Sequence, residues 1–172
     1  MNTKPKNTNL KFLNVLNDIL SSLGIKRKDF GTPLGWTAQN TSYHFTSDDM
    51  LYGDIRTALL ARGYSIEAML DPIDPNTTLP NYSFKGRITA GMSHRFPDYF
   101  EKHIANGGPL AFIGTAIRAS GRTLGSVLYA ADIDMSSFRH FIVRRGDMRV
   151  SYIYRIAAVL HAQVVWKVDS IN

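Results

Sequence analysis

Hydrophobic residues in the C-terminal third of the chain recur every three or four positions, which is the spacing of one face of an α-helix. Glycines and short polar stretches interrupt the pattern, so it predicts four short helices rather than one long helix. The predicted segments and their inward residues are 110–119 with Ile113, Ala116 and Ile117; 124–131 with Val127, Leu128 and Ala131; 135–144 with Phe138 and Ile142; and a last helix with Ile153, Ile156, Ala157 and Leu160.

Residues suited to capping stand at the starts of these predicted helices. Thr123, Asp134 and Ser151 precede the second, third and fourth helix, where a side-chain oxygen can accept a hydrogen bond from a free backbone amide. Only residues 132–134 separate the second helix from the third, which suits a tight turn between helices that cross at a large angle. Two short helices joined in this way, with a helix on either side, form the layout of a helix-turn-helix DNA-binding domain.

A comparable pattern runs through residues 10–63, with one awkward position. Pro33 falls where the second helix should lie, and a proline inside a helix costs about 3 kcal/mol. That helix therefore either ends before Thr32 or belongs to a distorted unit. The other predicted elements are a first helix with Phe12, Leu13, Leu16, Ile19 and Leu20 inward and Gly24 at its end; a turn at Gly35; a third helix, 38–46, capped by Thr37 with Thr41 and Phe45 inward; and a fourth helix capped by Asp48 or Asp49, carrying Leu51, Ile55, Ala58 and Leu59 and ended by Gly63.

Each fourth helix is followed by a run in which apolar and polar residues alternate, the period of a β-strand. The runs contain Ile66, Ala68 and Leu70 in the first unit and Val164, Trp166 and Val168 in the second. Because a lone strand is not stable, we expect the two runs to pair with each other or with a third segment. Short identities such as Asp49-Met50 and Asp147-Met148 add to the indication of an internal repeat.

The residues before and between the two units predict less regular structure. The expected features are a flexible polar arm over 1–9 and, within a linker over 71–109, a proline-rich stretch at 71–82, a potential strand at 83–89 and a helix between Pro97 and Gly107. This helix carries Phe96, Phe100 and Ile104 on one face. We expect it either to buttress the second unit or to form an interface.

A resemblance to the lambda-repressor-like (XRE) regulators lies in residues 128–142, which read Leu-Tyr-Ala-Ala-Asp-Ile-Asp-Met-Ser-Ser-Phe-Arg-His-Phe-Ile. This segment resembles the helix-turn-helix of that family, and 150–160 resembles the helix that follows it. In the first unit, Leu34-Gly-Trp-Thr resembles the family's turn. The chain departs from the family where Asp132 stands in place of the usual turn glycine and Ile142 in place of the usual late glutamate.

The resemblance implies a mainly α-helical chain with two tandem four-helix lambda-repressor-like domains, over 10–70 and 110–172, each followed by a short strand that can pair with the other. It also implies sequence-specific binding of double-stranded DNA by a transcriptional regulator that acts by occupying its operator. Such proteins usually dimerise to contact two half-sites, and a covalent tandem can replace the dimer. Because the two units differ in their reading residues, the expected DNA site is not a palindrome. A homodimer of the chain is left open.

Composition favours a polyanionic partner. The net charge is +6 and the pI about 9.7, with +4 in residues 110–172, +2 in 1–70 and zero in 71–109. The chain has no cysteine, no apolar run of about eighteen residues and no signal-peptide pattern, so we expect a soluble, cytoplasmic protein without a membrane partner.

Motifs for catalysis are missing from the sequence. No dinucleotide-binding, P-loop, zinc-protease or serine-hydrolase motif occurs, and none of the five histidines is paired with another at metal-ligand spacing. We therefore expect no enzyme activity, no cofactor and no metal ion. His44 is expected to be a partly buried packing residue rather than a base contact, and Trp36 and Trp166 are expected to belong to the core.

The candidate DNA contacts follow from the position of each residue in its unit. In the second unit they are Met135, Ser136, Ser137, Arg139 and His140 for base edges; Arg144, Arg145 and Arg149 for phosphates; and Arg122 with Thr123 for a phosphate at a helix N-terminus. In the first unit they are Gln39, Asn40, Ser42 and Tyr43 for bases and Lys26, Arg27 and Lys28 for phosphates. Arginine suits guanine, and glutamine or asparagine suits adenine.

Two other functions remain open at this point. The same fold could bind a protein through its third helix, as an antitoxin or adaptor does. It could also bind DNA without sequence preference, through phosphates and DNA shape.

Overall fold

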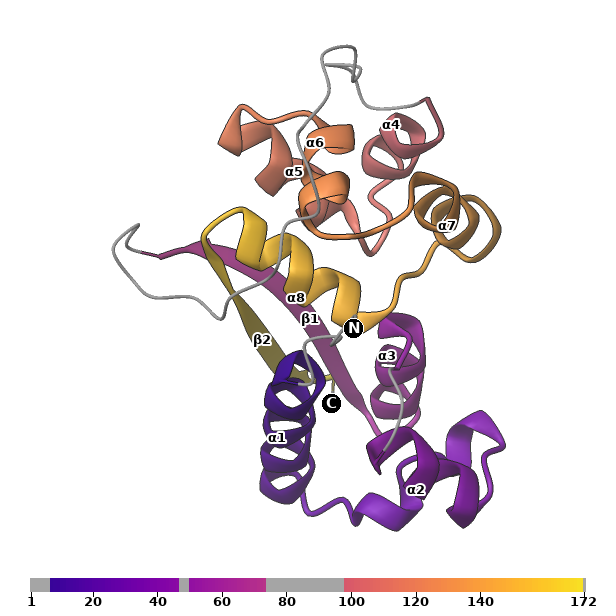
Figure 1. Ribbon diagram of the computed structural model, residues 1–172. Coiled ribbons are helices and arrows are strands. Elements are labelled where there is room, and N and C mark those ends of the chain that lie inside the picture. The colour runs from indigo at the N-terminus through magenta and orange to yellow at the C-terminus, as the bar shows by residue number, and fades with distance from the viewer. Residues whose placement is uncertain (1–6, 47–49, 74–97, 172) are drawn as a thin grey trace. The chain divides into compact units, whose positions relative to one another are not determined.

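The structure is a computed structural model that describes residues 7–46, 50–73 and 98–171 (Figure 1). It confirms a mainly helical chain with a small antiparallel sheet of two strands in the described part. The elements are α1 (Asn7–Ser22), η1 (Arg27–Asp29), η2 (Thr32–Leu34), α2 (Ala38–Thr46), α3 (Tyr52–Leu60), β1 (Tyr64–Pro72), α4 (Asp98–Ala105), α5 (Ala111–Ser120), α6 (Leu124–Ala130), α7 (Met135–His140), η3 (Phe141–Arg145), α8 (Val150–Val159) and β2 (Ala162–Ser170). η1 and η2 are 3-10 helices, and η3 is a π-helical turn.

The chain divides into two compact units. The first unit holds the described residues up to Glu67, together with 149–151 and the end of the chain from Lys167; the second holds the described residues of 68–148 and 152–166. Each unit therefore takes in residues from distant parts of the sequence. The predicted domains, 10–70 and 110–172, were each a single continuous segment, and the two units differ from them in this respect.

The first unit begins with α1, which buries Phe12, Leu16 and Leu20 on one face as their spacing predicts. α1 starts at Asn7, so the last three residues of the predicted arm 1–9 are helical instead. Residues 1–6, the rest of that arm, lie outside the described part.

The predicted second helix of the first unit is not an α-helix. The 3-10 turns η1 and η2 take its place, and Pro33 stands at the start of η2, where its missing N–H costs no hydrogen bond. Gly31 lies so close to the next turn that a Cβ there would be 2.7 Å from the Cβ of Trp36 and 2.4 Å from Oγ1 of Thr41. The chain thus passes through a tight bend at Gly31 and Pro33. The second helix is reduced to 3-10 turns, the first of which ends before Thr32, and the predicted four-helix layout is not confirmed for the first unit.

The remaining helices of the first unit follow the predicted spacing. Thr37 caps α2, since its Oγ1 accepts a hydrogen bond from the Asn40 N–H at 3.1 Å. The buried residues are Thr41 and Phe45 in α2 and Tyr52, Ile55, Ala58 and Leu59 in α3. The predicted caps Asp48 and Asp49 lie outside the described part, and Leu51 precedes α3.

β1 and β2 pair with each other, which confirms one of the two pairings that the alternating runs allowed. β1 extends to Pro72, into the predicted linker. Two backbone bonds mark the ends of the ladder: Ile171 N–H donates to the Gly63 carbonyl at 2.9 Å, and Ile73 N–H donates to the His161 carbonyl at 3.0 Å. A shift of 98 residues carries Gly63 to His161 and Ile73 to Ile171, so these bonds are equivalent under the repeat.

The same shift relates Leu51 to Arg149, and these two residues form an isolated antiparallel bridge within the first unit. Beside it, the Val150 N–H donates to the Met50 carbonyl at 2.9 Å. The residues in front of α3 therefore pair with those in front of α8, just as β1 pairs with β2. The repeat indicated by the sequence extends through α3 with β1 and α8 with β2.

α4 belongs to the core of the second unit. Its Phe100 is fully buried, with a ring centroid 5.2 Å from that of Phe138 in an edge-to-face arrangement. Its Ile104 lies against α5 at Gly114, where a Cβ would come within 2.3 Å of the Ile104 Cδ1. Of the two roles expected for this helix, the buttress is the one observed. The potential strand at 83–89 lies outside the described part.

Most predicted core positions of the second unit are confirmed, and two helix ends are corrected. The buried ones are Ile113, Ile117, Val127, Leu128, Ala131, Phe138, Ile142, Ile153, Ile156 and Ala157, whereas Ala116 and Leu160 are half-buried. α7 ends at His140 and widens into η3, so 135–144 is not one α-helix. α8 begins at Val150, so Ser151 lies buried inside the helix and does not cap it. None of the described helices combines the length and the apolar character needed to cross a bilayer.

Candidate nucleic-acid interface

The turn between α6 and α7 is built by backbone bonds around a left-handed residue. Asp132 has φ 56°, and its N–H donates to the Tyr129 carbonyl at 3.1 Å. The next amide, of Ile133, donates to the Leu128 carbonyl at 2.8 Å, which completes a Schellman motif at the end of α6. Both Ile133 and Leu128 are buried, and this apolar contact accompanies the motif. Asp132 therefore takes the conformation that a glycine most readily adopts, and aspartate is among the residues that tolerate it.

Side-chain caps begin both helices of this pair, as the sequence predicts. Thr123 Oγ1 accepts the Ser126 N–H at 3.1 Å at the start of α6. Asp134 accepts the Ser137 N–H at 3.0 Å and the Ser136 hydroxyl at the start of α7. These bonds, first from the Ser136 hydroxyl and then from the Ser137 amide, lower the pKa of the Asp134 carboxyl below its ordinary value. The direction in which α7 leaves the turn is thus set by local bonds.

The predicted base-contact residues lie mostly on the exposed side of α7. Met135, Ser136, Arg139 and His140 are exposed, while Ser137 is half-buried. Phe138 is fully buried, so it anchors the helix. α7 is thus a short helix with a mainly polar exposed side and a buried apolar residue that holds it in the core.

Tyr99 of α4 contacts one side of this exposed edge. The guanidinium carbon of Arg139 lies 5.8 Å from the centroid of the Tyr99 ring, and the Tyr99 hydroxyl lies 3.7 Å from the sulfur of Met135. Met135 and Arg139 are four residues apart and so share one face of the helix. Ser136 and His140, one residue further on, share a neighbouring exposed face.

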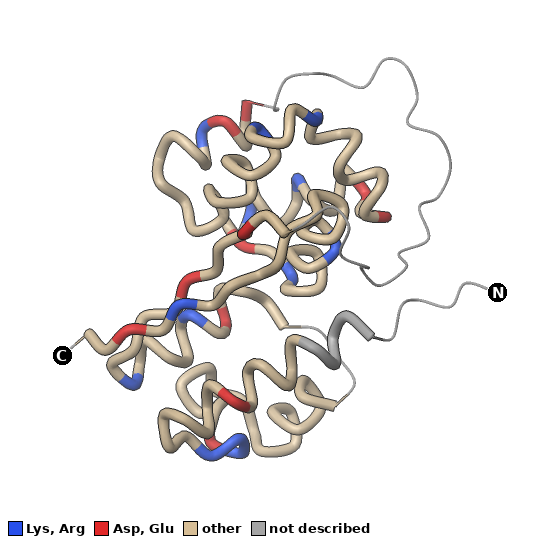
Figure 2. Tube along the Cα trace, turned by 90° about the vertical axis from the view of Figure 1, so that its left-hand side faces the viewer, with Lys and Arg blue, Asp and Glu red and all other residues tan. Residues whose placement is uncertain are grey.

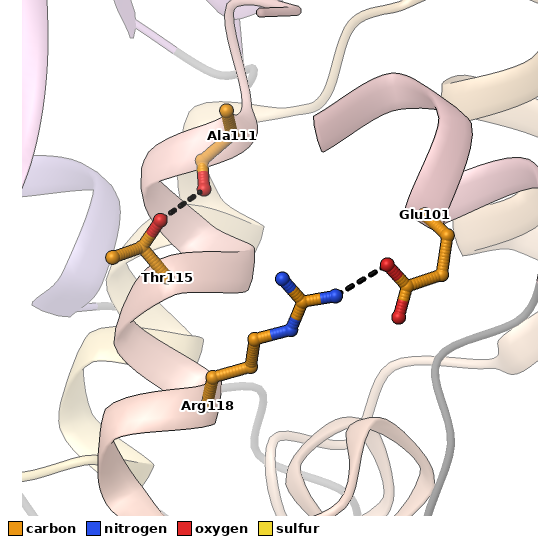
Figure 3. Close-up of polar contacts among 4 residues, drawn as sticks. All are labelled: Glu101, Ala111, Thr115 and Arg118. Atoms are coloured by element: carbon orange, nitrogen blue, oxygen red, sulfur yellow. Dashed lines mark hydrogen bonds and ion pairs between the residues drawn. The ribbon is translucent and has the colours of Figure 1, made fainter. Parts of the chain in front are cut away.

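α4 is itself held in place by contacts on several sides. The Glu101 carboxylate forms an ion pair with the Arg118 guanidinium of α5, whose Thr115 hydroxyl donates to the Ala111 carbonyl at 3.2 Å (Figure 3). The Leu110 N–H donates to Nε2 of His103 at 3.2 Å, so this histidine is an acceptor on that nitrogen. Partial burial lowers the pKa of His103. Tyr99 therefore belongs to a helix whose position is fixed by these contacts.

The arginines predicted to contact phosphates belong to different parts of the structure. Arg144 is exposed in η3. Arg149 is half-buried and belongs to the first unit, where its backbone bridges Leu51. The backbone of Arg145 ends η3, and its side chain lies outside the described part.

The pair predicted to hold a phosphate at the start of α6 has other partners. The Arg122 guanidinium donates to the Val159 carbonyl at 3.1 Å and so closes the end of α8. Thr123 uses its hydroxyl oxygen as the helix cap. Both residues therefore have structural partners within the second unit.

The candidates of the first unit are all exposed. Gln39, Asn40, Ser42 and Tyr43 lie along α2, and Lys26, Arg27 and Lys28 lie on and just before η1. The Arg27 guanidinium stacks 4.5 Å above the Phe45 ring, which ties η1 to α2. His44 stacks on Trp36 with centroids 4.1 Å apart, and Trp166 donates from Nε1 to the Tyr154 hydroxyl at 2.9 Å. All three aromatic side chains are half-buried packing residues rather than deep core.

Basic side chains occur in both units and not in a single stretch (Figure 2). In the first unit they gather at η1, where three successive residues are basic. In the second they are dispersed along the chain and interspersed with acidic residues (Figure 2). The positive charge of the first unit is therefore concentrated at three adjacent residues that could contact a phosphate. The positive charge of the second unit is spread along the chain.

The sequence missed Tyr99 as a neighbour of the candidate site. The spacing of the apolar residues in α4 predicted the helix and its buried face, but Tyr99 lies beside that face. A signal existed in its position, since it directly precedes Phe100, the deepest residue of α4. Which helix α4 would meet was not encoded in that spacing.

Among the described residues, no three histidine or acidic side chains come close enough to hold a metal ion. Comparison of the chain with protein-family models, with curated proteins and with solved structures finds no match. The geometry of the second unit and the sequence resemblance are therefore the two observations that bear on function.

Proposed function

We propose that the chain binds double-stranded DNA sequence-specifically and that α7 of the second unit is its recognition helix. The observation that carries the proposal is the α6–α7 pair: a Schellman turn at Asp132 leads through the Asp134 cap into a short helix whose polar edge is exposed. A helix of this kind enters the major groove with its first residues against base edges.

Arg139 is the residue that we assign to base recognition first. It is exposed, and within the described ranges its guanidinium forms neither an ion pair nor a hydrogen bond, so its donors are available. A guanidinium can donate two parallel bonds to the O6 and N7 atoms of guanine. Ser136 and His140 are the neighbouring candidates, and the exposed Arg144 of η3 would contact a phosphate.

The first unit supplies a second contact region in this proposal. Lys26, Arg27 and Lys28 on and beside η1 would contact phosphates, while Gln39 and Asn40 at the start of α2 would face adenine. Two regions on one chain raise the effective concentration of the second contact once the first has formed. The resemblance to XRE regulators supports operator occupancy as the biological role.

The test is a binding selection from random duplex DNA, with the enriched duplexes then titrated at two salt concentrations. We expect an enriched, non-palindromic motif and an affinity that falls steeply with salt, because phosphate contacts release counterions. A motif that is a perfect inverted repeat would contradict the tandem arrangement. Salt-dependent binding without any motif would replace this proposal with an architectural role.

A second candidate function is protein binding through the same edge. Met135 is 40% exposed and Val143 is 55% exposed, and apolar side chains of this size on α7 and η3 favour a protein surface more than a base edge. This candidate gains if the full chain fails to bind any duplex at low salt. It then predicts that Val143→Asp abolishes binding of the protein partner. Leu60→Asp, at a position of the first unit with about the same exposure, is the control.

A further inference from the structure

We propose that Tyr99 is a positioning residue for DNA recognition: its ring, fixed on α4, holds the Arg139 guanidinium in the orientation that reads a base. This inference rests on the proposed function and deepens it, because it names a residue outside the helix-turn-helix that sets specificity.

The contact geometry is that of a cation above an aromatic ring. The Arg139 guanidinium carbon is 5.8 Å from the centroid of the Tyr99 ring, within the range at which the ring quadrupole attracts a cation. The Tyr99 hydroxyl reaches the Met135 sulfur at 3.7 Å, one helical turn earlier on α7. One side chain thus contacts α7 at two points on the same face.

Tyr99 can act in this way because α4 does not move freely. Phe100, its neighbour, is fully buried and packs edge-to-face against the ring of Phe138, which is fully buried in α7. The ion pair of Glu101 with Arg118 and the contact of Ile104 with Gly114 hold the same helix on α5 (Figure 3). The ring is therefore fixed relative to the backbone of α7.

A guanidinium held over an aromatic ring keeps its donors while losing rotational freedom. An arginine side chain gives up conformational entropy when it binds, and a contact that orders it beforehand reduces that loss. A ring contact leaves the N–H groups of the guanidinium unoccupied, whereas a carboxylate partner would occupy them. An aromatic neighbour is thus suited to orient a base-reading arginine without competing for its donors.

The same contact has an electrostatic signature on the tyrosine. Partial burial raises the pKa of the Tyr99 phenol, and the positive charge of Arg139 opposes that rise. Removal of the arginine charge should therefore raise the pKa of Tyr99 further. This gives a readout of the contact that needs no DNA.

The experiment uses the full chain and the duplex recovered by the binding selection, with a set of duplexes that carry single base changes. Tyr99→Leu keeps apolar volume and removes the ring; we expect discrimination at the base read by Arg139 to fall roughly two- to fivefold. Tyr99→Phe keeps the ring and should restore discrimination to near the wild-type level. In the Arg139→Ala background, Tyr99→Leu should have no further effect at that base.

The matched control is Tyr129→Leu, at a half-buried tyrosine of α6 that makes no ring contact with Arg139. Thermal unfolding of each variant establishes that it is folded at the temperature of the binding assay. If Tyr99→Leu weakens binding to all duplexes equally, or acts equally in the Arg139→Ala background, Tyr99 is a structural residue and the inference is wrong.

Failure of the proposed function gives a different pattern. If the wild-type chain enriches no motif, the recognition role of Arg139 falls, and the assignment of Tyr99 falls with it. The contact itself is then judged by NMR of tyrosine labelled at Cζ, with Tyr99→Phe to assign the signal. Arg139→Gln should raise the pKa of Tyr99, and an unchanged pKa would show that the two side chains do not meet in solution.

Discussion

At the residue scale, the second unit depends on a few side chains whose roles differ in kind. Asp132 and Asp134 set the backbone conformation of the turn. Phe138 anchors α7 in the core. The Arg139 guanidinium donates no hydrogen bond to the described residues. Each role can be removed separately by substitution.

Arg139→Ala should cost about 1–3 kcal/mol of binding free energy on the selected duplex and little on duplexes changed at the base it reads. The reason is that a bidentate arginine contributes to discrimination and not only to charge. Quantitative binding to the two classes of duplex measures the difference. Arg144→Ala is the comparison, because loss of a phosphate contact should weaken binding to all sequences. An equal loss on every duplex for Arg139→Ala would remove it from the recognition set.

Asp132→Val should lower the free energy of unfolding by about 1–2 kcal/mol, because a β-branched residue tolerates left-handed backbone poorly. Asp132→Gly should not destabilise the chain, since glycine adopts this φ without steric cost. Chemical denaturation of the two variants and the wild type gives the comparison. A Gly variant as unstable as the Val variant would show that the aspartate side chain, and not its φ, matters.

Lower pH should destabilise the second unit through His103. Burial lowers its pKa from the ordinary 6.5, so the unfolded chain binds a proton more readily than the folded one. The stability tied to the neutral imidazole is fully present above about pH 6.5 and is lost as the pH falls through the folded pKa. Melting temperatures between pH 5 and 8 should show a steeper fall for the wild type than for His103→Gln. Parallel profiles would contradict this assignment.

At the scale of elements, α4 is the addition that distinguishes the second unit from its predicted outline. It was expected within a linker, yet it contributes Phe100 to the core and Tyr99 to the edge of α7. The candidate recognition helix of the second unit is thus supported by α4, whereas α2 of the first unit follows two 3-10 turns.

Phe100→Ala should lower the free energy of unfolding by about 3–5 kcal/mol, the usual cost of removing a fully buried phenylalanine. Tyr43→Ala, at a residue that is 57% exposed on α2, should cost far less. Urea denaturation of both variants makes the measurement. If the two costs were equal, α4 would be only loosely attached to the second unit.

At the scale of the whole molecule, equivalent segments of the internal repeat pair with each other through their backbones. β1 with β2, and the bridge of Leu51 with Arg149, join segments that correspond under one shift of 98 residues. Both pairings connect residues far apart in sequence, so each closes a long loop.

The register of the sheet can be tested with cysteines, since the native chain has none. The Ser65 hydroxyl donates to the Asp169 carbonyl at 3.5 Å, which places these residues opposite each other within the first unit. We expect the double variant Ser65→Cys with Asp169→Cys to form a disulfide under mild oxidation, as a thiol count and mass spectrometry would show. Tyr64→Cys with Asp169→Cys should not, because neighbouring positions face opposite sides of a strand. The reverse result would mean a one-residue slip.

The features that follow from sequence alone are those decided within four or five residues. Thr37, Thr123 and Asp134 cap the helices for which they were predicted, and the buried faces of α1, α5 and α6 lie at the predicted positions. Capping and helix periodicity depend on neighbours along the chain, which the sequence displays directly. The misplaced cap Ser151 has a non-local cause, because the bridge of Arg149 to Leu51 and the bond from Val150 to Met50 accompany a start of α8 two residues earlier than predicted.

Contacts between distant residues were decided only by the tertiary structure. The tight bend at Gly31 depends on Trp36 and Thr41 packing against it, so no α-helix forms there. Arg149 joins the first unit through its bridge to Leu51, and the Arg122 guanidinium donates to a carbonyl at the end of α8. The sequence by itself determined helices, caps and alternating strands, because these follow from local spacing. The pairing of the strands depends on how whole elements pack, and so does the contact of Tyr99 with Arg139. Local spacing along the sequence does not determine that packing.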